Sequence, residues 1–277
     1  MLIYGKEIRE KIKEGVAHAA QKIPMSLVVV RIGDDKSSQA YVNGIKKFGD
    51  ETGVKVEIAS FSADISLEEA IKHIEELNQD PGVNGIMLQT PLPPHLDIAV
   101  LANVIDYHKD VEGIHNYNLG KLISKQEGIK PATPKAVISM LKHYDIPIEG
   151  KKVCIVGRSA ILGSPLAMMM SSENGTITLC HSRTKNLDNE TRNADILVAA
   201  LGKANFITPD MVSEQSVIID VGINFDENGR MVGDVHQESK AKARIASAVP
   251  GGVGLITVAE LFDNLRIISQ NNGWVIN

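Results

Sequence analysis

A glycine-containing turn follows the apolar run at residues 153–156 and precedes an apolar segment with helical character. It reads Gly157-Arg158-Ser159-Ala160-Ile161-Leu162-Gly163-Ser164-Pro165. A strand, a glycine turn and a helix N-terminus together direct backbone N–H groups and the positive end of a helix dipole toward one point, where phosphate binds. The spacing differs from the common G-x-G-x-x-G fingerprint, so the turn alone is also compatible with an ordinary strand-to-helix connection.

The end of the next predicted strand indicates which dinucleotide would bind. An NAD site usually has an Asp or Glu there, which binds the ribose hydroxyls. Residues 178–184 read TLCHSRT and contain no carboxylate. Ser182, Arg183 and Arg158 instead offer a hydroxyl and two guanidinium groups, which suit a 2′-phosphate. The sequence therefore favours NADP over NAD, with a solvated surface charge as the alternative interpretation of Arg183.

The elements that must position these residues alternate along the chain. Apolar, β-rich runs at residues 26–33, 54–61 and 85–89 are separated by helical patterns, which predicts a parallel sheet covered by helices. Residues 67–77 have apolar side chains at helical spacing, with Ser66 as the N-cap and Glu69 completing a capping box. Further strands are expected at residues 176–182, 195–201 and 216–222. The fold class is therefore α/β.

Length and composition limit the classes of protein. A chain of 277 residues is expected to form two domains, and 43% hydrophobic with 23% charged residues excludes disordered and fibrous classes. The net charge is −5 without long charged blocks, which argues against nucleic acid and membranes as partners. No signal peptide or apolar run near the ~18 residues of a membrane span is present, so a cytoplasmic protein is expected. Cys154 and Cys180 are expected to be core residues.

Several separated strings point to one family. They are SSQAYV, NGIMLQTPLP, KDVEGIHNYNLGKL, PATPKAV, VGRSAILGSP, HSRTKNL, VIIDVGIN, VGDV and VPGGVGLITVAEL. In this order they closely resemble the methylenetetrahydrofolate dehydrogenase/methenyltetrahydrofolate cyclohydrolase family, from about Gly5 to Leu265. The resemblance implies a folate-binding catalytic domain at residues 1–122, a Rossmann-type NADP domain at 123–255 and a helix at about 256–277 that packs back on the first domain. It also implies a cleft between the domains, a homodimer and tetrahydrofolate one-carbon derivatives as substrates.

The resemblance also assigns roles to single residues. It implies catalytic roles for Tyr41, Gln89 and Glu112, folate contacts for Tyr41, Gln89, Pro250, Gly251 and Gly252, and cofactor contacts for Gly157, Arg158, Ser159, Gly163, Pro165, Ser182, Arg183 and Ile223. Some of these have a chemical reason of their own. Gln89 follows an apolar strand, and its amide can pair with the donor and acceptor edge of a pterin. Asp220 and Gly222 end a strand, where α/β proteins place ligands.

One departure from the family pattern affects catalysis. Members with both activities usually carry a Tyr followed by a Lys at i+4 on one helix, whereas Tyr41 is followed at i+4 by Ile45. On an α-helix i+4 lies about 40° from the first residue, whereas i+5 and i+6 lie about 140° and 120° away. Lys46 and Lys47 are therefore expected on the surface unless Gly44 breaks the helix, and Lys46 is kept only as a doubtful catalytic candidate.

A second departure lies in the motif KDVEG, where the family usually has KDVDG. Glu112 therefore stands where an Asp is expected. The extra methylene moves the carboxylate by more than about 1 Å, and catalytic geometry is sensitive on that scale.

The two reactions of the family make different demands. Hydride transfer from 5,10-methylenetetrahydrofolate needs aligned partners but no proton transfer. Hydrolysis of the methenyl cation needs a positioned acid or base, worth about 10²- to 10⁴-fold, which is the role that the resemblance gives to the missing Lys. We therefore expect an NADP-dependent dehydrogenase with weak or absent cyclohydrolase activity. The alternatives are a bifunctional enzyme that uses Lys46 or Lys47, a non-catalytic folate- or nucleotide-binding protein, and an unrelated NADP oxidoreductase.

A metal site is not expected. The eight His residues form no catalytic triad and no H-x-x-x-H pair that would put two ligands on one helix face.

Overall fold

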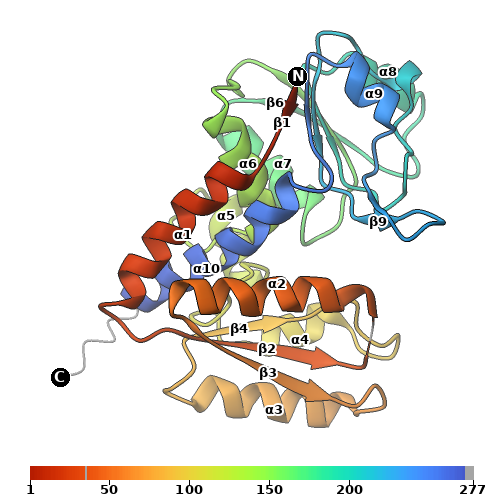
Figure 1. Cartoon of the computed structure of the whole chain (residues 1–277). Helices are drawn as coiled ribbons and strands as arrows, with labels where there is room; N and C mark the ends of the chain where they lie inside the picture. The colour runs from red at the N-terminus through yellow and green to blue at the C-terminus, as the bar shows by residue number, and fades with distance from the viewer. Residues whose placement is uncertain (35, 272–277) are drawn as a thin grey trace. The chain divides into compact units, whose positions relative to one another are not determined.

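The computed structural model describes residues 1–34 and 36–271 and divides the chain into two units (Figure 1). The small-sheet unit comprises Glu10–Ala132 and the chain from Val258, and the large-sheet unit comprises Met1–Arg9 and Thr133–Thr257. The chain passes from the small-sheet unit into the large-sheet unit between Ala132 and Thr133, inside the string PATPKAV. The sequence-based expectation places this domain boundary after residue 122. The mixed α/β architecture predicted from the alternating runs is confirmed.

A three-stranded parallel sheet with the order β3-β2-β4 forms the centre of the small-sheet unit. Its strands are β2 (Ser26–Ile32), β3 (Lys55–Phe61) and β4 (Gly85–Leu88). Because side chains alternate along a strand, Leu27 and Val29 of β2 face one side and Val28 and Val30 the other. Both sides are buried, which explains the continuous apolar run in the sequence.

Helices cover both faces of this sheet, and Figure 1 shows α2 and α3 on opposite sides of it. On the face of Leu27, Phe48 of α2 and Phe262 of α10 pack with ring centroids 4.7 Å apart. The other face packs against α3 and α4. The expectation for residues 272–277 as part of the last helix lies outside the described residues. The helices of this part of the chain are α1 (Lys6–Ala20), α2 (Lys36–Thr52), α3 (Leu67–Gln79), α4 (Ile98–Val104), α5 (Asn116–Ile123) and α10 (Val253–Asn271).

The start of α3 confirms the predicted capping box. Ser66 Oγ accepts a hydrogen bond from Glu69 N at 3.2 Å, and Ser66 N donates to Glu69 Oε2 at 3.1 Å. The hydrogen bonds that Ser66 N and Ser66 Oγ donate to the Glu69 carboxylate lower the pKa of Glu69. The cap fixes where α3 begins, and β4 follows it.

The large-sheet unit contains a six-stranded parallel sheet with the order β1-β11-β8-β7-β5-β6. The chain goes from β5 to β6 on one side and then to β7 on the other, so the connection after β5 lies at a topological switch point, where ligands bind in such sheets. The strands are β1 (Leu2–Ile3), β5 (Lys152–Val156), β6 (Thr176–Cys180), β7 (Ile196–Ala199), β8 (Val217–Asp220) and β11 (Ile245–Ser247), with a separate antiparallel pair, β9 (Asn224–Phe225) and β10 (Met231–Val232).

The helices of the large-sheet unit are short and follow the strands. α7 lies against β5 and β6, and α9 lies against β11. They are α6 (Ala132–His143), α7 (Gly163–Ser172), α8 (Leu187–Arg192) and α9 (Gln237–Lys242), with one 3₁₀ turn, η1 (Pro209–Met211).

Cys154 and Cys180 lie in the core of the large-sheet unit, as predicted. Both are buried, and their Sγ atoms are 3.7 Å apart. Burial raises the pKa of both thiols. Among the helices of residues 1–34 and 36–271, none has the length and apolar character to cross a membrane.

Candidate active site

Gln89 follows β4 directly and carries a buried oxygen atom that lacks a partner. The residue is 6% exposed, and its Nε2 donates to Thr90 O at 2.5 Å. Within the described residues, no group donates a hydrogen bond to its Oε1. An unpaired buried acceptor costs about 1–3 kcal/mol. A ligand with an N–H or O–H donor would satisfy it.

Arg31 occupies the matching end of the neighbouring strand. Val30 of β2 pairs with Leu88 of β4. Arg31 and Gln89 come next in their strands and project toward the face that α2 covers. The guanidinium group forms an ion pair with Asp34, but its buried Nε atom has no partner in the described part of the chain. Arg31 lies inside an apolar run in the sequence and was therefore not predicted as a site residue, although its place near a strand end was a usable signal.

Glu112 reaches the same strand end from the segment KDVEG. Ile86 N donates to Lys109 O at 2.8 Å, so this segment runs beside β4. Leu88 N donates to Glu112 Oε2 at 3.0 Å. Burial raises the pKa of Glu112 to about 8, and the charge of Asp110 adds to the rise. The carboxyl group is therefore largely protonated at neutral pH and can donate a hydrogen bond.

Asp110 holds the turn that presents Glu112. Its carboxylate accepts hydrogen bonds from Gly113 N, His115 N and Asn118 Nδ2 at 2.9, 2.9 and 2.8 Å. Burial raises the pKa of Asp110, whereas these hydrogen bonds lower it. Gly113 has a φ of 69°, a conformation that favours glycine. The first acidic residue of KDVEG thus positions the second, a division of roles that the motif alone did not reveal.

Helix α2 carries Tyr41 toward Glu112 and buries Ile45 one turn later. Burial raises the pKa of Tyr41, and the charge of Glu112 contributes to the rise, so the two side chains interact electrostatically. Ile45 is 0% exposed in the cluster that contains Phe48 and Phe262, and Tyr41 packs against the same cluster. A hydrocarbon side chain therefore fills the i+4 position.

Lys46 and Lys47 point elsewhere. Both are exposed, α2 continues through Gly44, and Lys47 Nζ lies 4.0 Å from Glu51 Oε1. No lysine of residues 1–34 and 36–271 is among the groups that shift the pKa of Tyr41 or of Glu112. The structure therefore does not bring Lys46 or Lys47 together with the other predicted site residues.

Gly157 and Gly163 allow β5 and α7 to approach each other closely. Gly157 has a φ of 128°, and a Cβ atom there would lie 2.1 Å from Ala200 O. A Cβ atom on Gly163 would lie 1.9 Å from Gly157 O. Leu162, the N-cap of α7, gives no side-chain hydrogen bond. Ser164 N donates to Ser159 O at 3.1 Å and Pro165 has no N–H, so Gly163 N is the group of the first turn that can serve another acceptor. Pro165 is buried in this turn. The loop has the features of a phosphate site.

Four polar residues lie at the same edge of the sheet. β5 and β6 are parallel neighbours, so their carboxyl ends lie side by side. Arg158 and Ser159 follow β5, Ser182 and Arg183 follow β6, and all four are exposed. The structure thus brings together the hydroxyl and guanidinium groups that the sequence assigned to a 2′-phosphate.

Ile223, Pro250, Gly251 and Gly252 lie in loops of the large-sheet unit. Ile223 is 55% exposed, and Pro250 is exposed. Gly251 has a φ of 99°, and Gly5 N donates to its carbonyl oxygen at 2.8 Å. A Cβ atom on Gly252 would lie 2.2 Å from the carbonyl oxygen of residue 248. Positions 251 and 252 of this loop therefore favour glycine. Without side chains there, a ligand can approach the backbone of the loop closely.

Asp220 corrects one sequence-based expectation. Its side chain is fully buried, forms an ion pair with Lys240 at 2.7 Å and accepts hydrogen bonds from Gly222 N and Asp234 N at 3.1 and 2.9 Å. Burial raises its pKa, and Lys240 opposes the rise. Asp220 is therefore occupied by the protein itself and joins the loops around the strand end instead of facing a ligand. The apolar run around it gave no sign of this buried ion pair.

Comparisons with known proteins cover both units. Residues 3–112 match the family model described as tetrahydrofolate dehydrogenase/cyclohydrolase, catalytic domain, and residues 131–272 match its NAD(P)-binding domain. The bifunctional protein FolD 2 of Syntrophomonas wolfei is 63% identical over 270 residues, which cover 98% of this chain and 99% of that protein.

Solved structures of similar fold also cover nearly the whole chain. The crystal structure of the bifunctional enzyme FolD from Campylobacter jejuni has a TM-score of 0.94 at 38% identity and covers 98% of this chain and 99% of that chain. The methylenetetrahydrofolate dehydrogenase-cyclohydrolase of Trypanosoma brucei, complexed with NADP cofactor and inhibitor, has a TM-score of 0.92 at 28% identity and covers 98% of each chain.

Proposed function

The chain belongs to the tetrahydrofolate dehydrogenase/cyclohydrolase family, and on this premise we propose that it oxidises 5,10-methylenetetrahydrofolate to 5,10-methenyltetrahydrofolate with NADP, with weak or absent cyclohydrolase activity. The observation that carries the second part is the burial of Ile45 one helical turn after Tyr41.

Hydride transfer depends on orientation. NADP, when bound, supplies the acceptor for the hydride. In our proposal, Gln89 Oε1 accepts a hydrogen bond from the pterin, and the protonated Glu112 donates one, which fixes the ring. Tyr41 packs beside them on α2. When the hydride leaves the bridging carbon, the adjacent nitrogen lone pair stabilises the cation, so no side chain has to accept a proton.

Hydrolysis needs a side chain that takes a proton from water, and these side chains are poorly suited to that. Water that attacks the methenyl carbon loses a proton, and ring opening then delivers a proton to nitrogen. Ile45 cannot carry one. Tyr41 holds its proton because burial raises its pKa further above neutrality. Glu112 is mostly protonated at neutral pH, and in this proposal its proton is already donated to the pterin, so without a lysine at position 45 no second group is left to take a proton from the attacking water. Hydrolysis is therefore slow.

The cofactor assignment rests on the fit of the glycine loop. Gly157 and Gly163 exclude side-chain atoms where the backbone must approach the phosphates, and the N-terminus of α7, with Gly163 N, is directed there. Arg183 and Ser182 bind the 2′-phosphate in this proposal, and Arg158 assists. The T. brucei relative with NADP supports the same choice. Ile223 contacts the cofactor, and Pro250, Gly251 and Gly252 contact folate, as the family resemblance implies.

The second candidate is a fully bifunctional enzyme. It is favoured by the name of the S. wolfei relative, a bifunctional protein. It would need Lys46 or Lys47 to supply the proton transfer. The exposure of both lysines favours the first candidate.

The proposal is tested by mixing purified protein with 5,10-methylenetetrahydrofolate and either NADP or NAD. We expect reduced nucleotide to form with NADP and much more slowly with NAD. No reduction of either nucleotide would contradict the dehydrogenase assignment, and equal efficiency would contradict the role of Arg183. A homodimer and a cytoplasmic location remain part of the proposal, and light scattering of the purified protein tests the first.

A further inference from the structure

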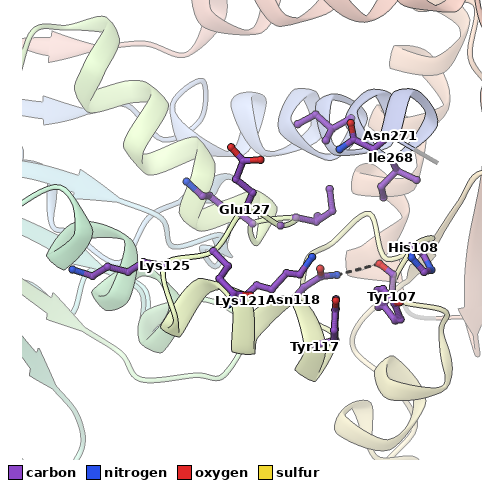
Figure 2. A pocket seen from close by; sticks show the side chains of 14 residues that line it. Tyr107, His108, Tyr117, Asn118, Lys121, Lys125, Glu127, Ile268 and Asn271 are labelled. Carbon is purple, nitrogen blue, oxygen red and sulfur yellow. Dashed lines mark hydrogen bonds between the residues drawn. The ribbon is translucent and has the colours of Figure 1, made fainter. Parts of the chain in front are cut away.

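A hollow separate from the predicted folate residues lies within the small-sheet unit (Figure 2). Its volume is about 700 Å³, and its lining comes from residues 107–130 and 267–271. Tyr41, Gln89 and Glu112 are not part of this lining. The volume lies within the range of about 300–1,000 Å³ that is usual for ligand pockets.

One wall of the hollow is a row of aromatic rings. The ring centroids of Tyr107 and Tyr117 are 4.0 Å apart, and those of Tyr107 and His108 are 3.9 Å apart. Asn118 Nδ2 donates to Tyr107 O at 3.3 Å and to Asp110 Oδ2 at 2.8 Å, which ties the wall to the buried turn. Tyr117 is 44% exposed. The ring of Tyr117 is thus held in place by its neighbours while much of its side chain stays accessible.

Lys121 is held in the same hollow by packing. Its Nζ lies 4.8 Å from the centroid of the Tyr117 ring, and a Cβ atom on Gly128 would lie 2.9 Å from Lys121 Cδ, so the stem passes close to Gly128. Figure 2 shows its ammonium group directed toward Tyr117 and Asn118. No described carboxylate pairs with this ammonium group. A cation that rests on a ring face keeps its capacity to bind an anion.

Two further lysines lie at the rim. Lys125 follows α5, two residues after its last residue, in a left-handed conformation with a φ of 56°, and Gln126 N donates to Lys121 O at 2.8 Å. Lys125 points outward in Figure 2. Lys130 is fixed through its backbone, since Asn264 Nδ2 donates to its carbonyl oxygen at 2.9 Å.

The hollow has a net positive charge, whereas the chain as a whole has a net negative charge. Glu127 is the only carboxylate among the lining residues, and it forms no ion pair with the three lysines in the described part of the chain. A net positive hollow on a chain with a net charge of −5 is an electrostatic feature that a bound anion would neutralise.

We propose that this hollow binds a small anion with at least two acidic groups. One acidic group binds Lys121 Nζ and the hydroxyl of Tyr117, and a second binds the ammonium groups of Lys125 and Lys130. The shared chemistry is that of a polycarboxylate or a polyphosphate. An anion with a single acidic group would contact either Lys121 and Tyr117 or the lysines at the rim, but not both. The proposal does not depend on folate or NADP chemistry.

Calorimetric titration of the full chain with citrate, pyrophosphate and acetate tests it, with NADP at saturation so that pyrophosphate cannot use the glycine loop. We expect 1:1 binding of citrate, pyrophosphate or both with a Kd on the order of 0.1–1 mM, and no comparable binding of acetate. Lys121→Gln should weaken binding at least ~10-fold. Lys72→Gln, which removes the same charge from an exposed position of α3, should change it by less than about 2-fold.

Lys130→Gln provides a second variant if Lys121→Gln lowers the melting temperature, and it should also weaken binding. Binding of citrate alone or of pyrophosphate alone supports the site and identifies its acidic group. The proposal is overturned if neither polyanion binds up to about 10 mM, or if the Lys121 and Lys130 variants bind as tightly as Lys72→Gln. Acetate binding equal to that of citrate would also overturn it.

Discussion

The carboxyl group of Glu112 accepts a hydrogen bond from the backbone N–H of Leu88, with 3.0 Å between Oε2 and N. This bond ties the acidic residue of KDVEG to the end of the strand that precedes Gln89. Glu112 is partly buried, and this burial raises its pKa to about 8. The protonation state of Glu112 therefore changes just above neutral pH.

Glu112→Gln should reduce the pH dependence of stability. Since the pKa rises from 4.5 to about 8 on folding, the folded protein keeps a proton that the unfolded chain has released between these values. Stability therefore falls as pH rises through this window. We expect the melting temperature of the wild type to fall more between about pH 6 and about pH 9 than that of Glu112→Gln. Equal falls would show that Glu112 does not titrate in this range.

Ile45→Lys should create hydrolytic activity. The new ammonium group would lie on the face of α2 that carries Tyr41, where it can assist proton transfer. We expect hydrolysis of methenyltetrahydrofolate to rise by at least ~10-fold, part of the 10²- to 10⁴-fold that acid–base catalysis supplies. Because Ile45 is fully buried, the melting temperature should also fall.

The matched control is Ile45→Met, which keeps a similar volume without a charge. It should leave hydrolysis at the wild-type rate. If Ile45→Met raises hydrolysis as much as Ile45→Lys, the effect comes from altered packing, and the role assigned to the ammonium group is wrong.

Arg183→Gln should shift the cofactor preference. Loss of a guanidinium group that pairs with the 2′-phosphate should raise the KM for NADP by about 10- to 100-fold and leave the KM for NAD nearly unchanged. Arg244→Gln removes the same charge from another exposed position and should change neither value. Equal increases for both cofactors in Arg183→Gln would argue against the 2′-phosphate contact.

Gln89→Leu should separate stability from substrate binding. The variant removes the unpaired buried Oε1 and with it a cost of about 1–3 kcal/mol, which offsets the lost hydrogen bond to Thr90. We expect an unchanged or higher melting temperature together with a KM for folate raised at least ~10-fold. A fall in both stability and folate affinity would indicate a purely structural Gln89.

Local patterns allowed much of the fold to be predicted. The alternation of apolar runs predicted the three strands of the small sheet and the strands β5 to β8 of the large one, but not β1 or β11. Ser66 with Glu69 predicted where α3 begins, because this signal depends on residues close together in the chain. The glycine loop was also predictable, since the close approach of backbone atoms at Gly157 and Gly163 leaves no other residue type.

The parts that escaped prediction depend on contacts between distant segments. Arg31 and Gln89 are neighbours only because β2 pairs with β4, and Asp220 is neutralised by Lys240 from a separate helix. Nothing local to Asp220 distinguishes a buried ion pair from a ligand-binding carboxylate. The raised pKa of Glu112 likewise arises from burial by the folded chain, which the motif KDVEG does not encode.

The most direct measurement is the rate at which the wild-type protein hydrolyses methenyltetrahydrofolate, followed as loss of its near-ultraviolet absorbance on a preparation that reduces NADP. The burial of Ile45 predicts hydride transfer together with hydrolysis close to the buffer rate, unchanged by Lys46→Gln or Lys47→Gln. Hydrolysis well above the buffer rate would contradict this, and its loss in either lysine variant would identify the bifunctional enzyme instead.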